Sequence, residues 1–317
     1  MIDYHTLGRT GLRVSSLGLG TVELGIDYGI DAPGHFGRPA VADSIRVVHA
    51  ALDAGVNYID TARAYGDSEK VLGSALNGRR DQVVLATKAF TRSPDGSDLA
   101  GEALRSHMRA ELDTSLQLLH TDYLDLWQVH SLDANALAQI EVMAEVFGEA
   151  QQKGKVRWTG ASVYGTEHPS LALESDVFDV LQVPYSVFDQ RLDDEAIPMA
   201  AKQGVGIVAR SILLKGVLTT KAEHLPEHLD ALRFHSRRFR DLVEASGLDL
   251  TPAQVAIAFG LAHPHIGNVL VGVRTEHELA ENLKAAECSL TEDLLAALRE
   301  LRLDDPDLLD PQTWGIP

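Results

Sequence analysis

Residues 56–66, VNYIDTARAYG, form the unit from which the fold of this chain can be predicted. The run Val56–Thr61 is short and mainly apolar, as in a strand that is buried within a sheet. Directly before it, apolar residues recur at helical spacing between Val41 and Leu52, and Gly55 stands in the position of a helix C-cap. The segment therefore predicts a helix that leads into a buried strand, followed by the loop that carries Tyr65.

The same alternation of helix and strand recurs along the chain. Apolar strands without an internal polar alternation are typical of a parallel sheet that is buried on both faces. The predicted strands are residues 15–21, 56–61, 82–88, 123–130, 156–162, 180–185, 206–211 and 268–273. Their number and the chain length predict an α/β protein with a closed (β/α)8 TIM barrel, in one domain spanning residues 1–317 with an N-terminal hairpin in residues 3–14.

An open, doubly wound sheet is the alternative fold. Such sheets usually carry a glycine-rich fingerprint in the first turn from strand to helix. Gly18 and Gly20 begin this pattern, but Glu23 stands where a third glycine is expected. A long loop rich in glycine and proline, residues 22–39, then replaces the expected helix. The barrel is therefore favoured.

Composition limits the classes of function. The chain is 45% hydrophobic and 23% charged, with a formal net charge of −18. Nucleic acids and anionic membranes attract basic surfaces, so neither is an expected partner. Cys288 is the only cysteine, which excludes a disulfide framework and a cysteine-based zinc site. The first residues lack a signal-peptide core and the apolar runs are too short to span a bilayer, so we expect a cytoplasmic protein.

Four residues near the ends of successive strands suggest acid catalysis. Catalytic groups of a (β/α)8 barrel lie at the C-terminal ends of its strands. Asp60 and Tyr65 follow one such strand, and Lys88 and His130 end the next two. A phenol is a poor acid at neutral pH, but a nearby ammonium lowers its pKa, and a carboxylate keeps that ammonium charged in a buried site. We therefore interpret Tyr65 as proton donor, with His130 orienting the substrate oxygen.

Eight motifs, in order, resemble those of the aldo-keto reductase family over nearly the whole chain. They are YHTLGRTGLRVSSLGLGT, YIDTARAYGDSE, VLATK, DYLDLWQVH, GASVYG, LQVPYS, GVLTT and VLVGVRTEHELAENL. The resemblance implies a (β/α)8 barrel that reduces aldehydes or ketones, or oxidises the corresponding alcohols or sugars, with NAD(P)H bound at the C-terminal face. It also implies Tyr65, Asp60, Lys88 and His130 as the catalytic residues.

The resemblance further implies which residues contact the cofactor and the substrate. Ser162 and Gln182 would hold the nicotinamide carboxamide, and the loop containing Gly216 would approach the pyrophosphate. The expected cofactor residues are Gly20, Thr21, Ser162, Gln182, Arg210, Ser211, Leu213, Gly216, Gly272, Arg274, Glu278 and Asn282. The C-terminal tail is expected near the active site, and the expected substrate pocket contains Tyr28, Trp127 and Trp314. His263-Pro264-His265 lacks a third ligand, so no metal is expected.

Three positions depart from the family pattern. Val163 stands where an asparagine often follows the serine, and Arg210 stands where an aromatic residue often stacks on the nicotinamide. Glu278 stands near the adenosine ribose, where a carboxylate favours NADH over the 2′-phosphate of NADPH, although Arg274 is close in sequence. The family habit predicts NADPH, and NADH is the alternative.

Two other functions fit the same residues. Lys88 at a strand end is also the position of a Schiff-base nucleophile in lyases of this fold. A cofactor-binding regulatory subunit with little turnover is the third possibility, as some relatives serve ion channels. The physiological substrate, the favoured reaction direction and the oligomeric state stay open.

Overall fold

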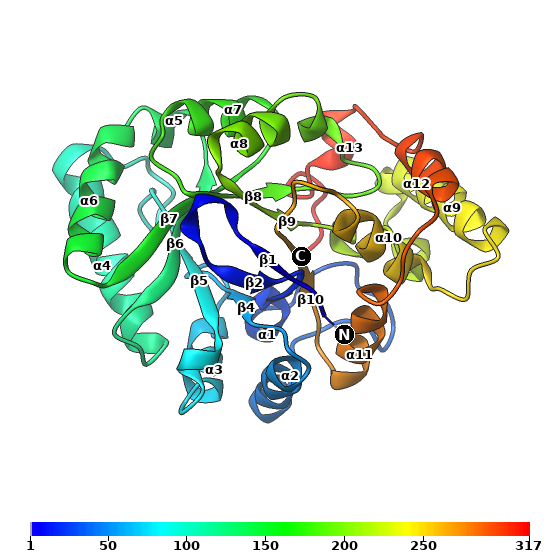
Figure 1. Ribbon diagram of the computed structural model, residues 1–317, viewed down its shortest axis with the longest axis horizontal. Coiled ribbons are helices and arrows are strands. Elements are labelled where there is room, and N and C mark those ends of the chain that lie inside the picture. Colours follow the sequence, from blue (N-terminus) through cyan, green and yellow to red (C-terminus); the bar gives the residue numbers. More distant parts are fainter. Residues whose placement is uncertain (1) are drawn as a thin grey trace.

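Eight parallel strands close into a barrel in the computed structural model, which describes residues 2–317 (Figure 1). The hydrogen-bonded order is β10-β3-β4-β5-β6-β7-β8-β9. The strands are β3 (Leu17–Gly20), β4 (Tyr58–Asp60), β5 (Val84–Ala89), β6 (Leu124–Leu132), β7 (Val156–Val163), β8 (Val180–Pro184), β9 (Gly206–Arg210) and β10 (Asn268–Gly272). The predicted (β/α)8 fold is confirmed, and the open sheet is excluded.

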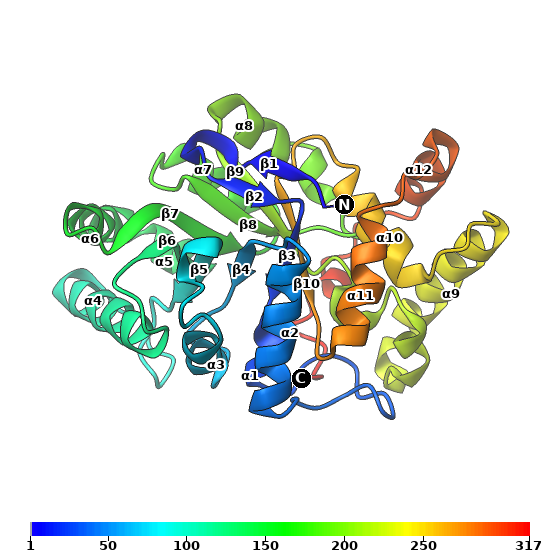
Figure 2. The ribbon, with the colours of Figure 1, turned by 60° about the horizontal axis from the view of Figure 1, so that its bottom comes forward.

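Helices surround the barrel and alternate with its strands (Figures 1 and 2). They are α1 (Val22–Gly25), α2 (Val41–Asp53), α3 (Ser68–Ala75), α4 (Gly101–Leu118), α5 (Ala134–Leu137), α6 (Ile140–Gln152), α7 (Glu167–Glu174), α8 (Ala196–Gln203), α9 (Asp230–Ala245), α10 (Pro252–Leu261), α11 (Glu276–Ala285), α12 (Glu292–Arg299) and α13 (Pro306–Leu309). Short 3-10 turns lie between several of them, including residues 80–82, 191–193 and 214–216. α1, α5 and α13 are single-turn helices that the sequence did not predict.

The helix boundaries follow local capping chemistry. At the start of α10, the Thr251 hydroxyl accepts from the Gln254 N–H while the Gln254 side chain accepts from the Thr251 N–H, which is a complete capping box. The helical spacing of apolar residues from Val41 predicts that Val41 shares the buried face of α2, and this prediction is wrong, because Val41 is 57% exposed. Val41 is the first residue of the helix and lies at its exposed end, ahead of the residues that pack against the barrel. Val47 and Val48 of the same helix are fully buried.

The predicted N-terminal hairpin is present and closes one end of the barrel. β1 (Tyr4–Thr6) pairs antiparallel with β2 (Arg13–Ser15), and the hairpin lies across the barrel in Figure 1. Its apolar side chains pack beneath the strands in one buried cluster with Tyr58 and Leu126. Gly8 has a positive φ of 50°, and a Cβ there would overlap the backbone nitrogen of Gly206. Only glycine lets the hairpin approach the barrel this closely.

The barrel interior has an apolar layer with a polar layer above it. The apolar layer contains Tyr58, Ala86, Leu126, Val180, Val208 and Leu270. Side chains along a strand alternate between faces, so residues two positions further along point into the same interior. Those residues are Asp60, Lys88, Gln128, Gln182, Arg210 and Gly272. The strand register therefore gathers the polar groups from many strands into one layer at the C-terminal end.

Trp127 lies on the opposite face of β6 from this interior. Its ring packs edge-on against Phe147 of α6, with ring centroids 5.1 Å apart, and it is fully buried. The structure therefore places Trp127 between barrel and helix rather than in a substrate pocket. The one-residue offset from Gln128 explains this difference, because neighbouring strand residues face opposite ways.

The C-terminal tail folds back onto loops at the C-terminal end of the barrel. Lys215 Nζ donates to the carbonyls of Pro311 (3.2 Å) and Ile316 (3.0 Å), and Gly29 N–H donates to the carbonyl of Pro317 (3.0 Å). Trp314 is 1% exposed and packs in the hydrophobic core. The tail thus reaches the expected region, but Trp314 anchors it instead of lining a pocket.

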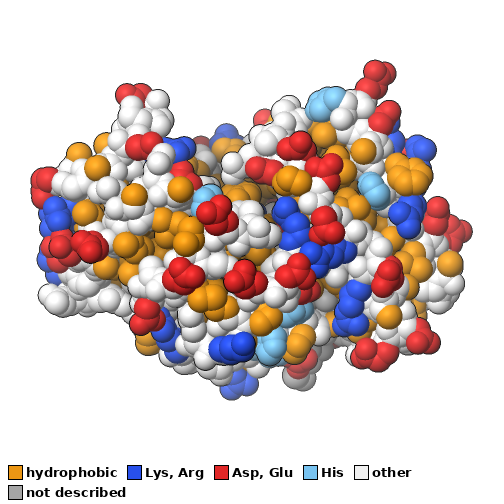
Figure 3. Space-filling model, turned by 90° about the horizontal axis from the view of Figure 1, so that it is seen from above, with side chains coloured by type: hydrophobic (Ala, Val, Ile, Leu, Met, Phe, Trp, Pro, Cys, Tyr) orange, Lys and Arg blue, Asp and Glu red, His pale blue; other side chains and the backbone are white. Residues whose placement is uncertain are grey.

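Acidic and basic side chains are interspersed on the surface of the molecule that Figure 3 shows. On the face shown in Figure 3, Asp and Glu side chains are distributed across the surface with Lys and Arg between them. Arg302, for example, pairs with Asp194 and Asp304. Of the helices in residues 2–317, none is long and apolar enough to cross a membrane.

Candidate active site

A cavity of about 440 Å³ lies at the C-terminal ends of the strands. It is lined by parts of the loops that follow β3, β4, β7, β9 and β10. Of the predicted site residues, the lining includes Gly20, Thr21, Tyr28, Asp60, Tyr65, His130, Ser162, Gln182, Arg210, Ser211, Leu213, Gly216, Gly272, Glu278 and Asn282. The structure therefore brings nearly all predicted cofactor and catalytic residues to one cavity.

Lys88 links Asp60 to Tyr65 beneath this cavity. Its ammonium donates to Asp60 Oδ2 (2.5 Å), to the Thr61 carbonyl (3.0 Å) and to the Tyr65 hydroxyl oxygen (3.3 Å). These contacts use its three N–H donors. The Tyr65 oxygen accepts a hydrogen bond from Lys88, so the hydroxyl hydrogen of Tyr65 is not used in that contact. It is free to be donated to a ligand in the cavity, which Tyr65 lines. This geometry is what a proton donor requires.

Asp60 is held on both carboxylate oxygens. Its Oδ1 accepts from the side-chain amides of Gln182 (2.7 Å) and Gln128 (3.2 Å), while Oδ2 accepts from Lys88. Asp60 is 2% exposed and Lys88 is fully buried. A buried ion pair is stable only when its remaining hydrogen-bonding capacity is satisfied, and the two glutamines supply this. Gln128 was not predicted, although it stands two residues before His130 on the same face of the strand.

The ground-state acidity of Tyr65 differs from the expectation. Burial, reinforced by the Asp60 carboxylate, raises the pKa of Tyr65 above its ordinary value, and the Arg210 cation opposes that rise. The phenol is therefore protonated at neutral pH, as a proton donor must be. Burial also lowers the pKa of Lys88, although the Asp60 carboxylate opposes this effect. Lys88 at 3.3 Å favours a phenolate most when charge develops on the oxygen during proton transfer.

His130 meets the cavity next to Tyr65. The two rings are perpendicular with centroids 5.7 Å apart, and Phe90 stacks on the other side of the imidazole at 5.0 Å. Burial, together with the Lys88 and Arg210 cations, lowers the pKa of His130 to about 3. The imidazole is therefore neutral at physiological pH. A neutral imidazole has one N–H with which to bind a carbonyl oxygen.

Arg210 lines the cavity together with Ser162 and is hydrogen-bonded to its neighbours. The Arg210 guanidinium donates to the Val163 carbonyl (2.8 Å), and to the hydroxyls of Ser162 (3.4 Å) and Ser211 (3.1 Å). Its plane lies over the ring of Tyr164 at 3.8 Å. Tyr164 also lines the cavity and was not predicted as a site residue. The side chain of Val163 is buried and supplies no hydrogen bond.

The loop after β9 adopts a strained conformation along the cavity. Ser211, Leu214 and Lys215 have positive φ angles of 59°, 48° and 53°, in a region that residues other than glycine rarely adopt. Gly216 follows with a φ of 103°. Lys215 is fixed to the C-terminal tail, which stabilises the strained turn. Backbone N–H groups in such turns bind anions, which suits a pyrophosphate.

The far part of the cavity, between β10 and α11, is rich in carboxylates. Glu23, Glu278 and Glu281 line it, together with Lys221. Glu278 accepts from the backbone N–H of Arg274 (2.8 Å) and from its guanidinium (2.6 Å). Arg274 is 7% exposed and does not itself line the cavity. The expected cofactor cation is therefore already paired with the expected cofactor carboxylate.

Glu23 was not predicted as a site residue, because in the sequence it marks only a departure from the glycine-rich fingerprint of an open sheet. It extends over Gly272, where a Cβ would overlap its carboxylate. Burial and the Glu278 carboxylate raise the pKa of Glu23 to about 7, although Lys221 and Arg274 oppose this. A carboxyl group that is partly protonated at neutral pH therefore faces the cavity.

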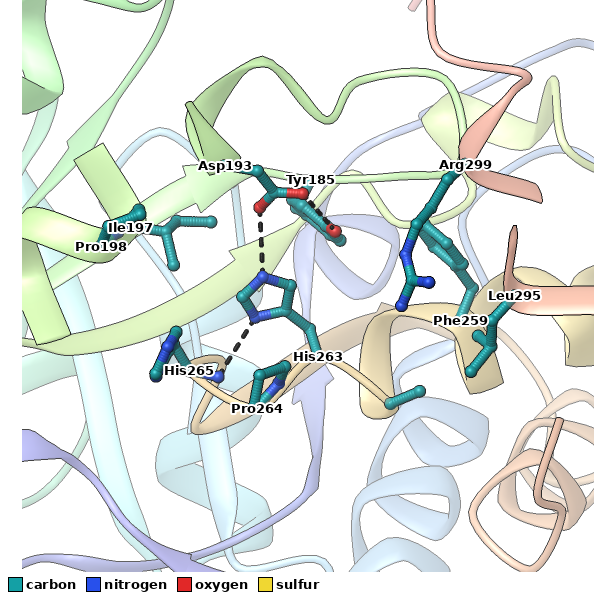
Figure 4. A pocket seen from close by; sticks show the side chains of 11 residues that line it. Tyr185, Asp193, Ile197, Pro198, Phe259, His263, Pro264, His265, Leu295 and Arg299 are labelled. Atoms are coloured by element: carbon teal, nitrogen blue, oxygen red, sulfur yellow. Dashed lines mark hydrogen bonds and ion pairs between the residues drawn. The ribbon is translucent and has the colours of Figure 1, made fainter. Parts of the chain in front are cut away.

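Another cavity, of about 300 Å³, lies outside the barrel between α8, α10 and α12 (Figure 4). There Asp193 accepts from the Tyr185 hydroxyl (3.0 Å) and pairs with His263 Nε2 (3.1 Å). His263 Nδ1 accepts from the His265 N–H (3.2 Å). The His-Pro-His segment thus fastens the end of α10 to the loop after β8. In residues 2–317 no group of three or more metal-ligating side chains is placed to hold a metal ion.

Comparison with known proteins agrees with this geometry. Residues 16–303 match the family model described as "Aldo/keto reductase family". The chain belongs to the aldo/keto reductase family. It is 33% identical to the uncharacterized oxidoreductase YrpG of Bacillus subtilis, covering 95% of this chain and 96% of the relative. It is 34% identical to the aldo-keto reductase YhdN of the same organism, over 75% of this chain and 71% of that protein.

A solved structure shows the same architecture. The holo form of the aldo-keto reductase AKR11C1 from Bacillus halodurans superposes with a TM-score of 0.79 and 26% sequence identity, covering 99% of this chain and 100% of that one. Aldo-keto reductases are oxidoreductases that use nicotinamide cofactors and bind small carbonyl substrates. The cavity suits such a cofactor, because it combines the polar side chains of Ser162 and Gln182 near Tyr65 with the loop after β9 and with the polar side chains of Glu278 and Asn282.

Proposed function

We propose that this protein reduces an aldehyde or ketone to the alcohol with a reduced nicotinamide cofactor, and that Tyr65 donates the proton. The observation that carries the proposal is the contact of Lys88 with both Asp60 and the Tyr65 oxygen. It fixes the phenol as an acceptor from Lys88 and leaves its proton available to a ligand in the cavity. A buried Asp60–Lys88 ion pair in contact with a phenol that lines the cavity favours chemistry over simple binding.

The chain's residues divide the reaction between them. The bound cofactor supplies a hydride to the carbonyl carbon. Tyr65 donates its proton to the carbonyl oxygen, and Lys88 stabilises the phenolate that forms. His130, which is neutral, binds the same oxygen and directs it toward Tyr65. In the reverse direction the Tyr65 oxygen accepts a proton from the alcohol.

Cofactor binding is assigned to groups along the cavity wall. Ser162 and the Gln182 carbonyl oxygen would hold the carboxamide, because the Gln182 amide nitrogen is already bound to Asp60. The backbone N–H groups of Leu213 and Lys215 would hold the pyrophosphate, because those of Leu214 and Gly216 already donate to the carbonyls of Ser211 and Leu213. At the adenosine end, Asn282 and Glu278 would bind ribose and adenine.

The electrostatics of the adenosine end favour NADH over NADPH, which reverses the preference expected from the family habit. A 2′-phosphate would meet the carboxylates of Glu278 and Glu281 and the partly protonated carboxyl group of Glu23. Arg274, the cation that would bind it, is already paired with Glu278. Ribose hydroxyls, in contrast, can donate to a carboxylate.

The two other candidate functions have less support. A Schiff-base nucleophile must reach its substrate, but Lys88 is fully buried and all three of its donors are used. A regulatory subunit does not need a proton donor poised beside its cofactor. Borohydride trapping of an adduct on Lys88 would support the lyase, and cofactor binding without turnover would support the subunit.

The proposed function is tested by turnover of a panel of aldehydes, ketones and sugars with NADH and NADPH, in both directions. We expect reduction of at least one carbonyl class, with a higher kcat/KM for NADH. Failure to oxidise either cofactor with any substrate, despite binding it, would contradict the proposal. The variant Glu278→Arg is expected to shift the kcat/KM ratio toward NADPH by about tenfold or more, because it replaces a repelling charge with an attracting one.

A further inference from the structure

Arg210 lines the cavity that contains Tyr65 and His130, and it has no carboxylate partner within residues 2–317. It ends β9 in the polar layer of the barrel interior, on the strand beside the one that carries Gln182. Its hydrogen-bond acceptors are two hydroxyls and a carbonyl, all neutral. Within residues 2–317, no ion pair to Arg210 is formed.

The other titratable groups of this layer contribute no net charge, because they are either paired with an opposite charge or neutral. Lys88 and Asp60 neutralise each other in a contact of 2.5 Å. His130 is uncharged, because burial and nearby cations lower its pKa to about 3. Tyr65 is protonated, because burial raises its pKa. The polar floor of the cavity therefore has one net positive charge, which is on Arg210.

The cofactor ring that donates the hydride must lie close to the Arg210 guanidinium. Hydride transfer places the donor carbon roughly 3–3.5 Å from the carbonyl carbon, and Tyr65 must contact the oxygen of the same carbonyl. Arg210 acts electrostatically on Tyr65, His130 and Lys88 alike. It is also 3.4 Å from Ser162, a residue assigned to the carboxamide. A nicotinamide ring that serves Tyr65 and contacts Ser162 would therefore lie next to the guanidinium.

We propose that Arg210 makes this protein bind the reduced nicotinamide cofactor in preference to the oxidised one. The oxidised ring is a cation and the reduced ring is neutral, so a fixed positive charge beside it destabilises the oxidised form alone. This inference rests on the proposed function and adds a preference for one redox state of the cofactor. Its consequence is that the protein loads the reduced cofactor and releases the oxidised one, which favours carbonyl reduction as the working direction.

The stacking of Arg210 on Tyr164 makes the charge a fixed feature of the site. The guanidinium lies 3.8 Å from the ring centroid and is held by three hydrogen bonds. Preorganised charges act more strongly than mobile ones, because they do not reorient to relieve repulsion. A lysine at this position would keep the charge but lose the planar contact and most of the hydrogen bonds.

The test is calorimetric titration of the whole protein with NADH, NAD⁺ and ADP-ribose, which lacks the nicotinamide. We expect wild type to bind NADH at least tenfold more tightly than NAD⁺. In Arg210→Met this ratio falls about tenfold, mainly because NAD⁺ binds more tightly, and in Arg210→Lys much of the ratio is retained. ADP-ribose affinity is the same in all three proteins. Arg299→Met, which removes an exposed arginine from the outer cavity, controls for the change in net charge.

Three results would overturn the inference. They are a wild-type ratio near one, an unchanged ratio in Arg210→Met, or an equal change in the affinity for ADP-ribose, which would indicate a general effect on the cavity. The wild-type ratio decides even if a variant fails to fold. Absence of binding by NADH, NADPH and ADP-ribose would instead refute the proposed function itself, so the two failures are distinguishable.

Discussion

Separating Asp60 from Lys88 tests whether the buried pair is stable only as a unit. In Asp60→Asn, the fully buried Lys88 ammonium keeps only neutral acceptors, the Thr61 carbonyl and the Tyr65 hydroxyl. Leaving one member of a buried ion pair unpaired costs about 3–5 kcal/mol. In Lys88→Met, Asp60 keeps the amide donors of Gln128 and Gln182, so we expect a smaller loss of about 2–3 kcal/mol.

The double variant Asp60→Asn/Lys88→Met contains no unpaired charge. We therefore expect it to be less destabilised than the sum of the two single variants by about 2 kcal/mol or more. The assay is urea unfolding of all four proteins at equal protein concentration, compared at their midpoints with the slope checked for constancy. A slope that changes between variants would require a second probe, such as near-UV circular dichroism.

The pH dependence of the same cycle has a definite sign. Burial lowers the pKa of Lys88 in the folded state, and the Asp60 carboxylate opposes that shift. Without Asp60 the pKa falls further, so the unfolded chain binds more protons than the folded one and stability rises with pH. The penalty of Asp60→Asn is thus expected to shrink as pH rises toward the ordinary pKa of lysine, about 10.4. Additive single-variant losses, together with a penalty that does not change with pH, would refute the reasoning.

Three further predictions concern other parts of the molecule. The pKa of Glu23 is raised to about 7, so the contribution of Glu23 to stability is present below its ordinary pKa and is lost as pH rises through 7. Glu23→Gln should therefore raise Tm by a few degrees more at about pH 8.5 than at about pH 5.5. An equal rise in Tm at both pH values would contradict this prediction. Lys215→Met, which releases the tail carbonyls, should increase proteolysis near the C-terminus and weaken ADP-ribose binding severalfold, and protection equal to wild type would contradict this role. Gly8→Ala should lower the free energy of unfolding by about 2 kcal/mol or more, whereas Gly11→Ala, at a positive φ with no neighbour within 4 Å, should cost only about 1 kcal/mol; equal losses would exclude the close approach to Gly206.

The strands were predictable from sequence because they are apolar runs bounded by glycine, proline and polar residues. Their observed ends lie close to the predicted ones, as at β7, predicted over 156–162 and observed over Val156–Val163. The face of α2 was assigned less well, because its first residue satisfies the helical period but stands at the exposed entry of the helix. Single-turn helices such as α13 have too few residues to show a period.

The gathering of the candidate site residues in one cavity was predictable, because a parallel barrel brings the C-terminal ends of its strands together. Gathering Asp60, Lys88 and His130 needed only this rule and the strand ends. The placement of Trp127 outside the cavity could also have been predicted, since it is one residue from Gln128. This prediction would have required the alternation of side chains between the two faces of a strand to be applied to residues 124–132.

Pairings between residues distant in sequence were not predictable in the same way. Nothing local indicates that Lys215 binds the carbonyl of Ile316, or that three residues after β9 adopt positive φ angles. The Arg274–Glu278 pair was within reach, because an i,i+4 spacing at the start of a helix favours contact. Its consequence for the cofactor needed the observation that Arg274 is buried and paired with Glu278 rather than lining the cavity.

The central claim is that Tyr65 donates the proton, and the variant Tyr65→Phe tests it most directly. Phenylalanine keeps the ring, its contact with the Lys88 ammonium and the shape of the cavity, and removes only the hydroxyl. With the best substrate of the panel, we predict that kcat falls by about a hundredfold or more, while the Kd for NADH stays within about twofold of wild type. A Tyr65→Phe protein that keeps kcat within about tenfold of wild type would contradict the account.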